Sequence, residues 1–235
     1  MHFSISSCSP EHNTAVIKAV AEAFSSTVYN DRIAVEGDTE ALARVLSKLI
    51  ENVFVPEIIS GMLSSEYAFL TRSDADEAHR RILMMISSFN NESVIYDRLT
   101  LCLSEYPEIN MDGFICFRLK DMLKKLEKLT YSAVNDLLKE KERDNLLQML
   151  REYSENRTHL FKKITVKKQN ERFALFDETE KRVITVFADH KDLTPEEELI
   201  NGLIYISPES IDISELQDKE MVAILAHIFS GRILD

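Results

Sequence analysis

The sequence predicts an α+β protein whose N-terminal and central parts are rich in helix and whose C-terminal third holds a small antiparallel sheet. Three observations predict this fold class. The 235-residue chain has only five glycines and five prolines, fewer turn residues than a large β-sandwich needs. Apolar residues recur at helical spacing through most of the chain before residue 158, and beyond it the spacing changes to two. Hydrophobic residues make up 45% of the chain, enough for a real core.

The chain begins with a strand, a helix and a second strand. Residues 2–6 and 32–38 alternate apolar and polar side chains, as short strands do. The helix between them begins with Ser9 as N-cap and Pro10 at its first position. A small β-α-β unit is therefore expected at the N-terminus.

Residues 38–106 are predicted to form a helical bundle, which completes a first region spanning residues 1–106. Asp38 caps its first helix, and Pro56 is expected to kink or restart that helix. A later helix is expected to begin with Ser73 as its N-cap.

The second region, residues 107–235, is expected to open with a turn at Gly113, which leads into a helix. Residues 114–156 contain no Gly or Pro, and their apolar residues from Ile115 to Leu137 lie on one helical face. A second apolar stripe, from Leu146 to Tyr153, points more than about 120° away from the first. One straight helix cannot bury both stripes against one core, so a break or strong bend is predicted near residues 139–145.

Three strands and two helices are predicted after this long helix. Residues 162–169, 172–177 and 182–188 are strand candidates separated by polar turns, and they are expected to form an antiparallel meander. Thr194, Pro195 and Glu197 predict a helix that starts with a capping box. A short strand near residue 211 and a terminal helix follow.

Charge and cysteine content narrow the function classes. The net charge of −12 argues against a general binder of nucleic acid or acidic membranes. Half of the 28 Lys and Arg residues nevertheless lie in residues 111–170, which carry a net charge of +5. Three widely spaced cysteines form no disulfide framework or zinc ribbon, which favours a reduced cytoplasmic protein. No apolar run approaches the ~20 residues that span a bilayer, and no signal peptide is visible.

No catalytic, cofactor or metal motif stands out, so no catalytic residue, cofactor or metal is assigned. The five glycines are at least 24 residues apart, which is incompatible with a phosphate-binding loop or a nucleophile elbow. The histidines lack zinc-ligand spacing. The cluster Asp189-His190-Lys191-Asp192 is interpreted as a polar loop in preference to half a metal site. His227, inside an apolar helix, is interpreted as a core histidine in preference to a ligand.

The second half of the chain resembles the YtxC-like family of sporulation proteins. The resemblance depends on "EINMDGFICFRLKDMLKKLEKL" (108–129), "LKEKERDNLLQMLREY" (138–153) and "FKKITVKK" (161–168), followed by "EEELINGLIYISPESIDIS" (196–214) and "MVAILAHIFSGRI" (221–233). It covers about residues 107–234. It implies a cytosolic protein of an endospore-forming bacterium and implies no reaction.

Three functions remain open. The first is a non-enzymatic accessory factor that acts in sporulation through contacts with another protein. The second is nucleic-acid binding through the basic segment 118–168. The third is a hydrolase whose site assembles from distant residues, because a triad is defined in space and not in sequence. A basic face that is either a partner-binding surface or ordinary solvated surface consists of Arg118, Lys120, Lys124, Lys125, Lys128, Lys163, Lys167 and Lys168.

Overall fold

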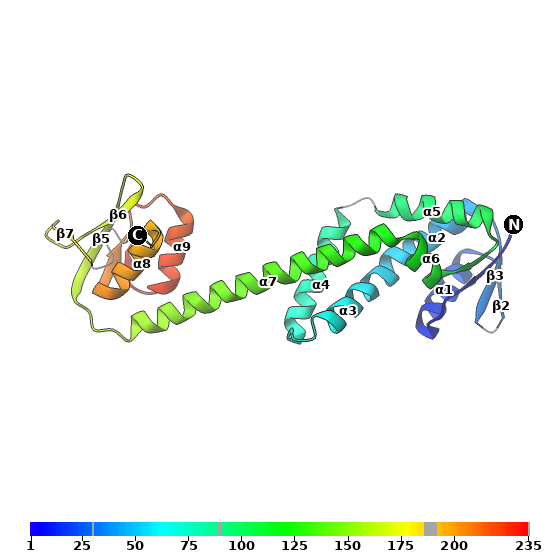
Figure 1. Ribbon diagram of the computed structural model, residues 1–235, viewed down its shortest axis with the longest axis horizontal. Coiled ribbons are helices and arrows are strands. Elements are labelled where there is room, and N and C mark those ends of the chain that lie inside the picture. Colours follow the sequence, from blue (N-terminus) through cyan, green and yellow to red (C-terminus); the bar gives the residue numbers. More distant parts are fainter. Residues whose placement is uncertain (30, 89–90, 186–191, 235) are drawn as a thin grey trace. The chain divides into compact units, whose positions relative to one another are not determined.

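The computed structural model describes residues 1–29, 31–88, 91–185 and 192–234, with Asn91 described by its backbone alone (Figure 1). The chain forms two compact units, Met1–Leu138 and Lys139–Asp235. Helix α7 (Lys120–Glu155) contains the boundary and belongs to both units. The sequence places the boundary at 106/107 instead. It lies further along the chain because residues such as Phe114, Leu126 and Leu137 pack into the core of the first unit.

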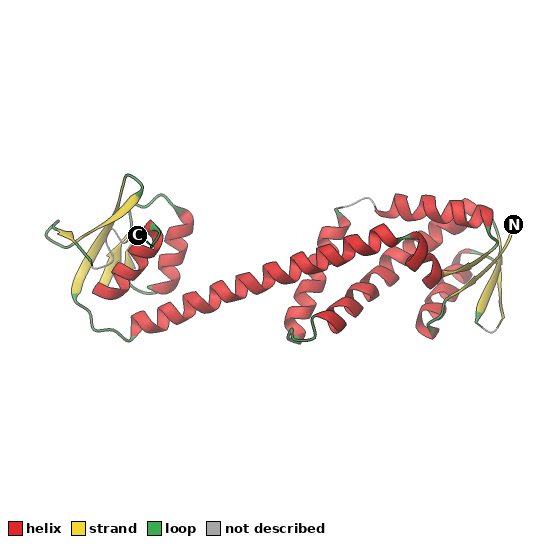
Figure 2. Ribbon diagram, viewed as in Figure 1, coloured by secondary structure: helices red, strands yellow, loops and turns green. Residues whose placement is uncertain are grey.

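The predicted α+β class is confirmed, with one correction to where the sheets lie. Figure 2 shows strands in both units and not only in the C-terminal third. Each sheet also mixes parallel and antiparallel pairs. The sequence underestimates the strands of the first unit because two of them are only three and four residues long.

The sheet of the first unit has the strand order β2-β3-β1-β4. Strand β1 pairs antiparallel with β3 and parallel with β4. Phe3 and Ile5 of β1 and Ile33 and Val35 of β3 are buried, and this alternation explains why both strands were predictable from sequence. The strands are β1 (His2–Ser6), β2 (Ser26–Tyr29), β3 (Arg32–Glu36) and β4 (Glu108–Asn110).

Helices make up the rest of the first unit, and two predicted N-caps are confirmed. Ser9 caps α1, where Pro10 takes the first position, and Asp38 caps α2. Ser73 is not a cap: Thr71 accepts the backbone N–H of Asp74 instead, so that helix begins at Arg72. The helices are α1 (Pro10–Ala23), α2 (Thr39–Leu49), the π-helix η1 (Ile50–Phe54), α3 (Val55–Glu66), α4 (Arg72–Ser87), α5 (Asn91–Glu105), α6 (Met111–Arg118) and α7.

The helical stretch is interrupted just before Pro56 and restarts there as α3, as the sequence predicts. A π-helical turn, η1, lies between α2 and α3, and the backbone N–H of Val55 donates to the carbonyl of Ile50. Proline has no backbone N–H to donate, so the regular pattern of helical hydrogen bonds cannot continue through Pro56.

Helix α6 starts earlier than the sequence predicts. Asn110 is its N-cap and accepts the backbone N–H of Gly113 at 2.9 Å, so Gly113 lies within the first turn of the helix and not in an entry turn. The helix ends at Leu119, whose φ of −110° and ψ of 25° are not helical. The apolar face predicted across this junction is nevertheless present, because Ile115, Leu119 and Leu126 are all buried.

The predicted break near residues 139–145 is wrong, because α7 is continuous from Lys120 to Glu155. The first apolar stripe of α7 packs against the core of the first unit, whereas only part of the second stripe packs against the core of the second unit. Ala133 and Leu137 belong to the core of the first unit, and Leu147 and Leu150 pack against that of the second. Leu146, Met149 and Tyr153 of the second stripe are exposed, so the continuous helix leaves much of that stripe in solvent. The charged residues 139–144 between the stripes are also exposed.

The second unit packs two helices against a sheet of order β7-β6-β5-β8-β9. The antiparallel meander β5-β6-β7 is confirmed, but its third strand is shorter than predicted: β7 covers only Arg182–Val183, residues 184–185 are not strand, and residues 186–188 lie outside the described residues. Strands β8 and β9 extend the sheet in parallel pairs. The elements are β5 (Phe161–Gln169), β6 (Arg172–Phe176), β7 (Arg182–Val183), α8 (Pro195–Ile206), β8 (Pro208–Asp212), α9 (Lys219–Ile228) and β9 (Ile233–Leu234).

The structure of α8 confirms its predicted capping box and explains the glycine at position 202. The capping box of Thr194 and Glu197 is present, with both reciprocal hydrogen bonds formed. Gly202 faces the sheet, where a Cβ would lie 3.3 Å from the side chain of Thr185. The helix can therefore approach the sheet closely at this position.

A candidate interaction surface on the first unit

The basic residues of α6 and α7 lie on a surface that the core beneath them holds in place. Met111, Phe114 and Ile115 anchor α6 in the core of the first unit, and Leu119 and Leu126 continue this anchoring into α7. The side chains of Arg118, Lys120, Lys124 and Lys128 are exposed on the outer side, whereas Lys125 is half-buried. We call Lys120, Lys124 and Lys128 the basic ridge, because residues four apart follow one another along a helix face.

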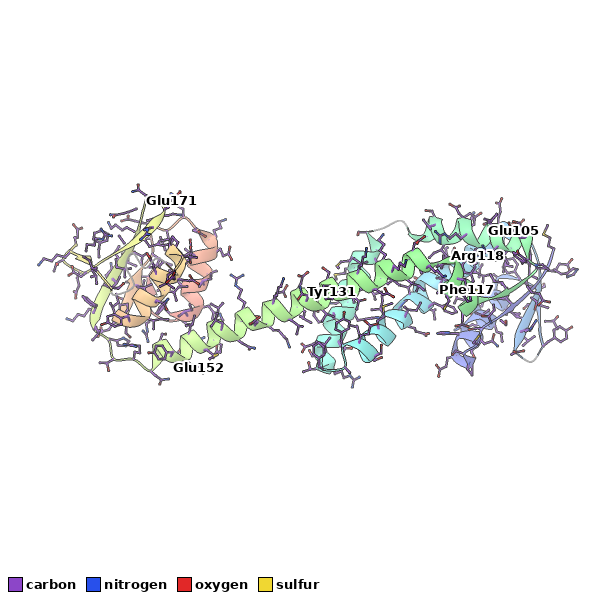
Figure 3. The ribbon with its side chains drawn as sticks, in the orientation of Figure 1. Glu105, Phe117, Arg118, Tyr131, Glu152 and Glu171 are labelled. Atoms are coloured by element: carbon purple, nitrogen blue, oxygen red, sulfur yellow. The ribbon has the colours of Figure 1, made fainter. Side chains whose placement is uncertain are left out.

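Two exposed aromatic side chains flank the basic ridge. Phe117 is 73% exposed and Tyr131 is 65% exposed. Figure 3 shows both along the α6–α7 segment, with Arg118 beside Phe117. The Lys120 Nζ atom lies 5.8 Å from the centroid of the Phe117 ring, within range of a cation–π contact.

A groove of about 330 Å³ runs between α5 and α6 beside Phe117. Leu101, 60% exposed, contributes a second large apolar side chain to it. Arg98 of α5 donates to the backbone carbonyl of Arg118 and to Asp121 Oδ2, so it bridges α5 to the junction of α6 and α7. The groove is lined by Arg98, Leu101, Cys102, Glu105, Phe117 and Arg118.

The thiol in this groove is poorly suited to nucleophilic chemistry. Burial raises the pKa of Cys102, and this effect outweighs the opposing charge of Arg118. The thiolate is the reactive form of cysteine, so a raised pKa keeps Cys102 protonated and unreactive.

The three predicted basic residues of β5 belong to the second unit, and two of them form ion pairs there. Lys163 Nζ lies 2.8 Å from Asp212 Oδ2, and Lys167 Nζ lies 2.7 Å from Glu215 Oε1. The hydrogen bond from Lys163, with that from Ser214, lowers the pKa of Asp212 to about 2. Lys168 is exposed and lies 5.7 Å from the centroid of the Phe173 ring. The positive charge of Lys163 and Lys167 is thus offset locally.

The structure also assembles an ionisable cluster that sequence analysis missed. His12 of α1 contacts Asp112 Oδ1 through Nδ1 at 3.1 Å and Glu57 Oε2 through Nε2. Asp112 also accepts the hydroxyl of Ser7 at 2.5 Å and the backbone N–H of Cys8 at 2.6 Å. These residues come from distant parts of the sequence, and no local spacing marks them.

The electrostatics of this cluster favour a charged His12. Burial lowers the pKa of His12, but the hydrogen bonds and charges of Asp112 and Glu57 outweigh it and raise the pKa overall. Burial raises the pKa of Asp112, but its hydrogen bonds with Ser7, Cys8 and His12 together lower it. Both ring nitrogens are occupied by carboxylates, so neither is open to take a proton from a nucleophile. The cluster links α1, α3 and α6 and offers no triad geometry.

The sequence also singled out His227 and the cluster around His190. His227 is exposed on α9 and is not a core residue, because it lines an open hollow with Glu140 and Asp144 of α7. Residues 189–191 of the Asp189–Asp192 cluster lie outside the described residues. Within the described part of the chain, no three His, Cys, Asp or Glu side chains gather as metal ligands.

Comparison with known proteins identifies the family. The chain matches the model of the YtxC-like family over residues 40–234. The protein belongs to the YtxC-like family. The match includes α2 to α5, so the YtxC-like region extends well beyond the second half that carries the resemblance in the sequence. No curated protein and no solved structure matches the chain.

Among the helices that the structure describes in this YtxC-like protein, none is both long enough and apolar enough to cross a bilayer.

Proposed function

We propose that this member of the YtxC-like family is a non-enzymatic accessory factor of sporulation that acts in the cytoplasm through contacts with another protein. The sporulation role follows from the family resemblance. The mode of action follows from the surface of α5, α6 and α7, with its basic ridge and exposed aromatic residues.

The observation that carries this proposal is the exposure of Phe117 at 73% beside a groove and a line of lysines. Single exposed apolar residues are common on protein surfaces. Here, however, the exposed Leu101 lines the same groove, and interfaces are enriched in aromatic residues beside charged rims. The unreactive Cys102 and the doubly occupied His12 favour contact over catalysis.

Nucleic-acid binding is the second candidate, because exposed aromatic side chains flank the basic side chains of α6 and α7. It predicts an affinity that falls steeply as salt concentration rises. The ion pairs of Lys163 and Lys167 weigh against it, since they leave less positive charge on β5 for phosphates.

Affinity capture of the tagged protein from sporulating cells tests the proposal. The capture is done with and without nuclease, and bound proteins are identified by mass spectrometry. We expect a nuclease-resistant protein partner that is lost when Lys120, Lys124 and Lys128 are all changed to Glu. The matched control changes Lys139 and Lys141, exposed on the same helix, to Glu and should retain the partner. Capture that yields no specific protein, or only nuclease-sensitive material, would overturn the proposal.

A further inference from the structure

Resting on the proposed function, the geometry points to one kind of partner: an acidic, amphipathic helical segment of another protein. We infer that such a segment places an apolar side chain in the α5–α6 groove and its carboxylates along the basic ridge.

The α5–α6 groove offers an apolar contact site for the partner. Leu101 and Phe117 lie on its two sides, from α5 and α6, and both are largely exposed. Covering them would remove apolar surface from water, which is the main driving force for association. A large apolar side chain between them would therefore be the energetic centre of the contact.

The spacing of the lysines in the basic ridge matches the spacing of carboxylates on a partner helix. Lys120, Lys124 and Lys128 follow one another at intervals of four residues, so they span about 12 Å along α7. Carboxylates four residues apart on a partner helix have the same spacing. A helix laid along α7 can therefore pair several carboxylates with the ridge while its apolar face covers Phe117.

The chemistry of the rim favours a protein over a nucleic acid. Glu105 lines the groove, and Asp121, 82% exposed on its side chain, lies at the foot of the ridge. Both carboxylates repel phosphates at close range. A peptide can place a Lys, Arg or uncharged residue opposite these two positions, which a phosphate backbone cannot do.

Photo-crosslinking tests the inference with the full chain in sporulating cells. The photoreactive residue p-benzoylphenylalanine replaces Phe117, and the control replaces Phe69, which is 67% exposed on the same unit but does not line the groove. We expect a protein adduct from position 117 only. Its cross-linked peptide should combine carboxylates one helical turn apart with a large apolar residue.

The affinity of that peptide, once synthesised, completes the test. We expect the wild-type chain to bind it, and Phe117→Ala, Leu101→Ser and the double variant Lys120→Glu/Lys124→Glu each to weaken binding about tenfold. The variants are first checked for unchanged circular dichroism, and all three alter exposed side chains.

Several results would overturn the inference: equal cross-linking from positions 117 and 69, a peptide without carboxylates, a nucleic-acid adduct, an adduct with a second copy of this chain, or unchanged binding by the variants. The two proposals fail separately. If capture yields a protein but position 117 gives no adduct, the groove is not the site and the proposed function stands. If capture yields no protein, the proposed function itself fails.

Discussion

His12 Nδ1 lies 3.1 Å from Asp112 Oδ1, and this contact joins the first turn of α1 to the first turn of α6. The other ring nitrogen contacts Glu57 of α3, and the Phe54 ring of η1 lies 4.5 Å from the imidazole, centroid to centroid. An imidazolium donates to both carboxylates, whereas a neutral imidazole has one N–H and can donate to only one of them. The cluster therefore makes the stability of the first unit sensitive to pH.

The sign of this pH dependence follows from the direction of each shift. The pKa of His12 is raised, so its stabilising contribution is complete below about 6.5 and is lost as pH rises through the higher folded-state value. The pKa of Asp112 is lowered, so its contribution is present above about 4 and is lost on acidification. We expect the unfolding free energy to fall by roughly 1 kcal/mol from pH 6 to pH 9, the size of one lost hydrogen bond.

Urea unfolding at several pH values measures this effect. His12→Gln, which cannot become charged, should lose the alkaline decline in stability. His2→Gln is the matched control, because His2 is exposed and its contact with Glu36 is long, at 3.8 Å. If wild type and His12→Gln showed the same pH profile between 6 and 9, the cluster would not act as described.

Alanine substitutions at Asn110 and at Gly113 should have opposite effects on the stability of the first unit. Changing Asn110 to Ala removes the acceptor of the Gly113 N–H and should destabilise the first unit by about 1 kcal/mol, as loss of an N-cap does. Gly113→Ala should be neutral or stabilising, since Gly113 is helical and an added Cβ would lie 3.4 Å from Asn110 Oδ1. Thermal unfolding distinguishes the two. A Gly113→Ala variant less stable than Asn110→Ala would contradict the observed start of α6.

Ser154 and Arg232 hold the end of α7 in the second unit. The Ser154 hydroxyl donates to the carbonyl of Ile228 at 3.2 Å, and Arg232 Nη2 donates to the Ser154 carbonyl at 2.9 Å. Ser154→Ala should destabilise the second unit by about 1 kcal/mol, because a buried carbonyl loses its donor. Ser132→Ala on the exposed side of the same helix should change stability by less than about 0.5 kcal/mol. Equal effects in denaturant unfolding would refute this account.

The continuity of α7 can be tested at Glu142. Glu142→Pro should lower helix content and destabilise the protein by about 3 kcal/mol, because proline disrupts a helix interior. Glu142→Ala is the control and should preserve helicity. Circular dichroism and chemical unfolding measure both effects. A proline tolerated at this exposed position would instead support the break that the sequence alone suggests.

The sequence predicts those parts of this fold that local chemistry determines. Ser9, Asp38 and Thr194 were identifiable as caps because a cap depends on residues within one turn. Strands β1, β3, β5 and β6 were identifiable because one of their faces is buried. In contrast, β2 and β4 are too short for alternation to mark them, and the parallel pairing of β8 with β5 depends on contacts between residues such as Ile164 and Ile211 that are distant in the sequence.

The candidate site was predictable in part. The exposure of Arg118 in α6 and of the lysines in α7 followed from helical periodicity, because their opposite face had to be buried. Helix periodicity alone could not show that Phe117 would be exposed, since that depends on the end of α6 at Leu119. It also could not show that Lys163 and Lys167 would face Asp212 and Glu215, whose positions depend on β8 and the turn after it.

Hydrogen–deuterium exchange of the full chain with its captured protein partner tests most directly whether the surface of α5, α6 and α7 binds that partner. We expect slower exchange on binding in the backbone of residues 98–105 and 114–131, which include the groove and the basic ridge, and little change elsewhere in the first unit. Protection confined to the second unit, or no protection in residues 114–131, would show that this surface is not the binding site.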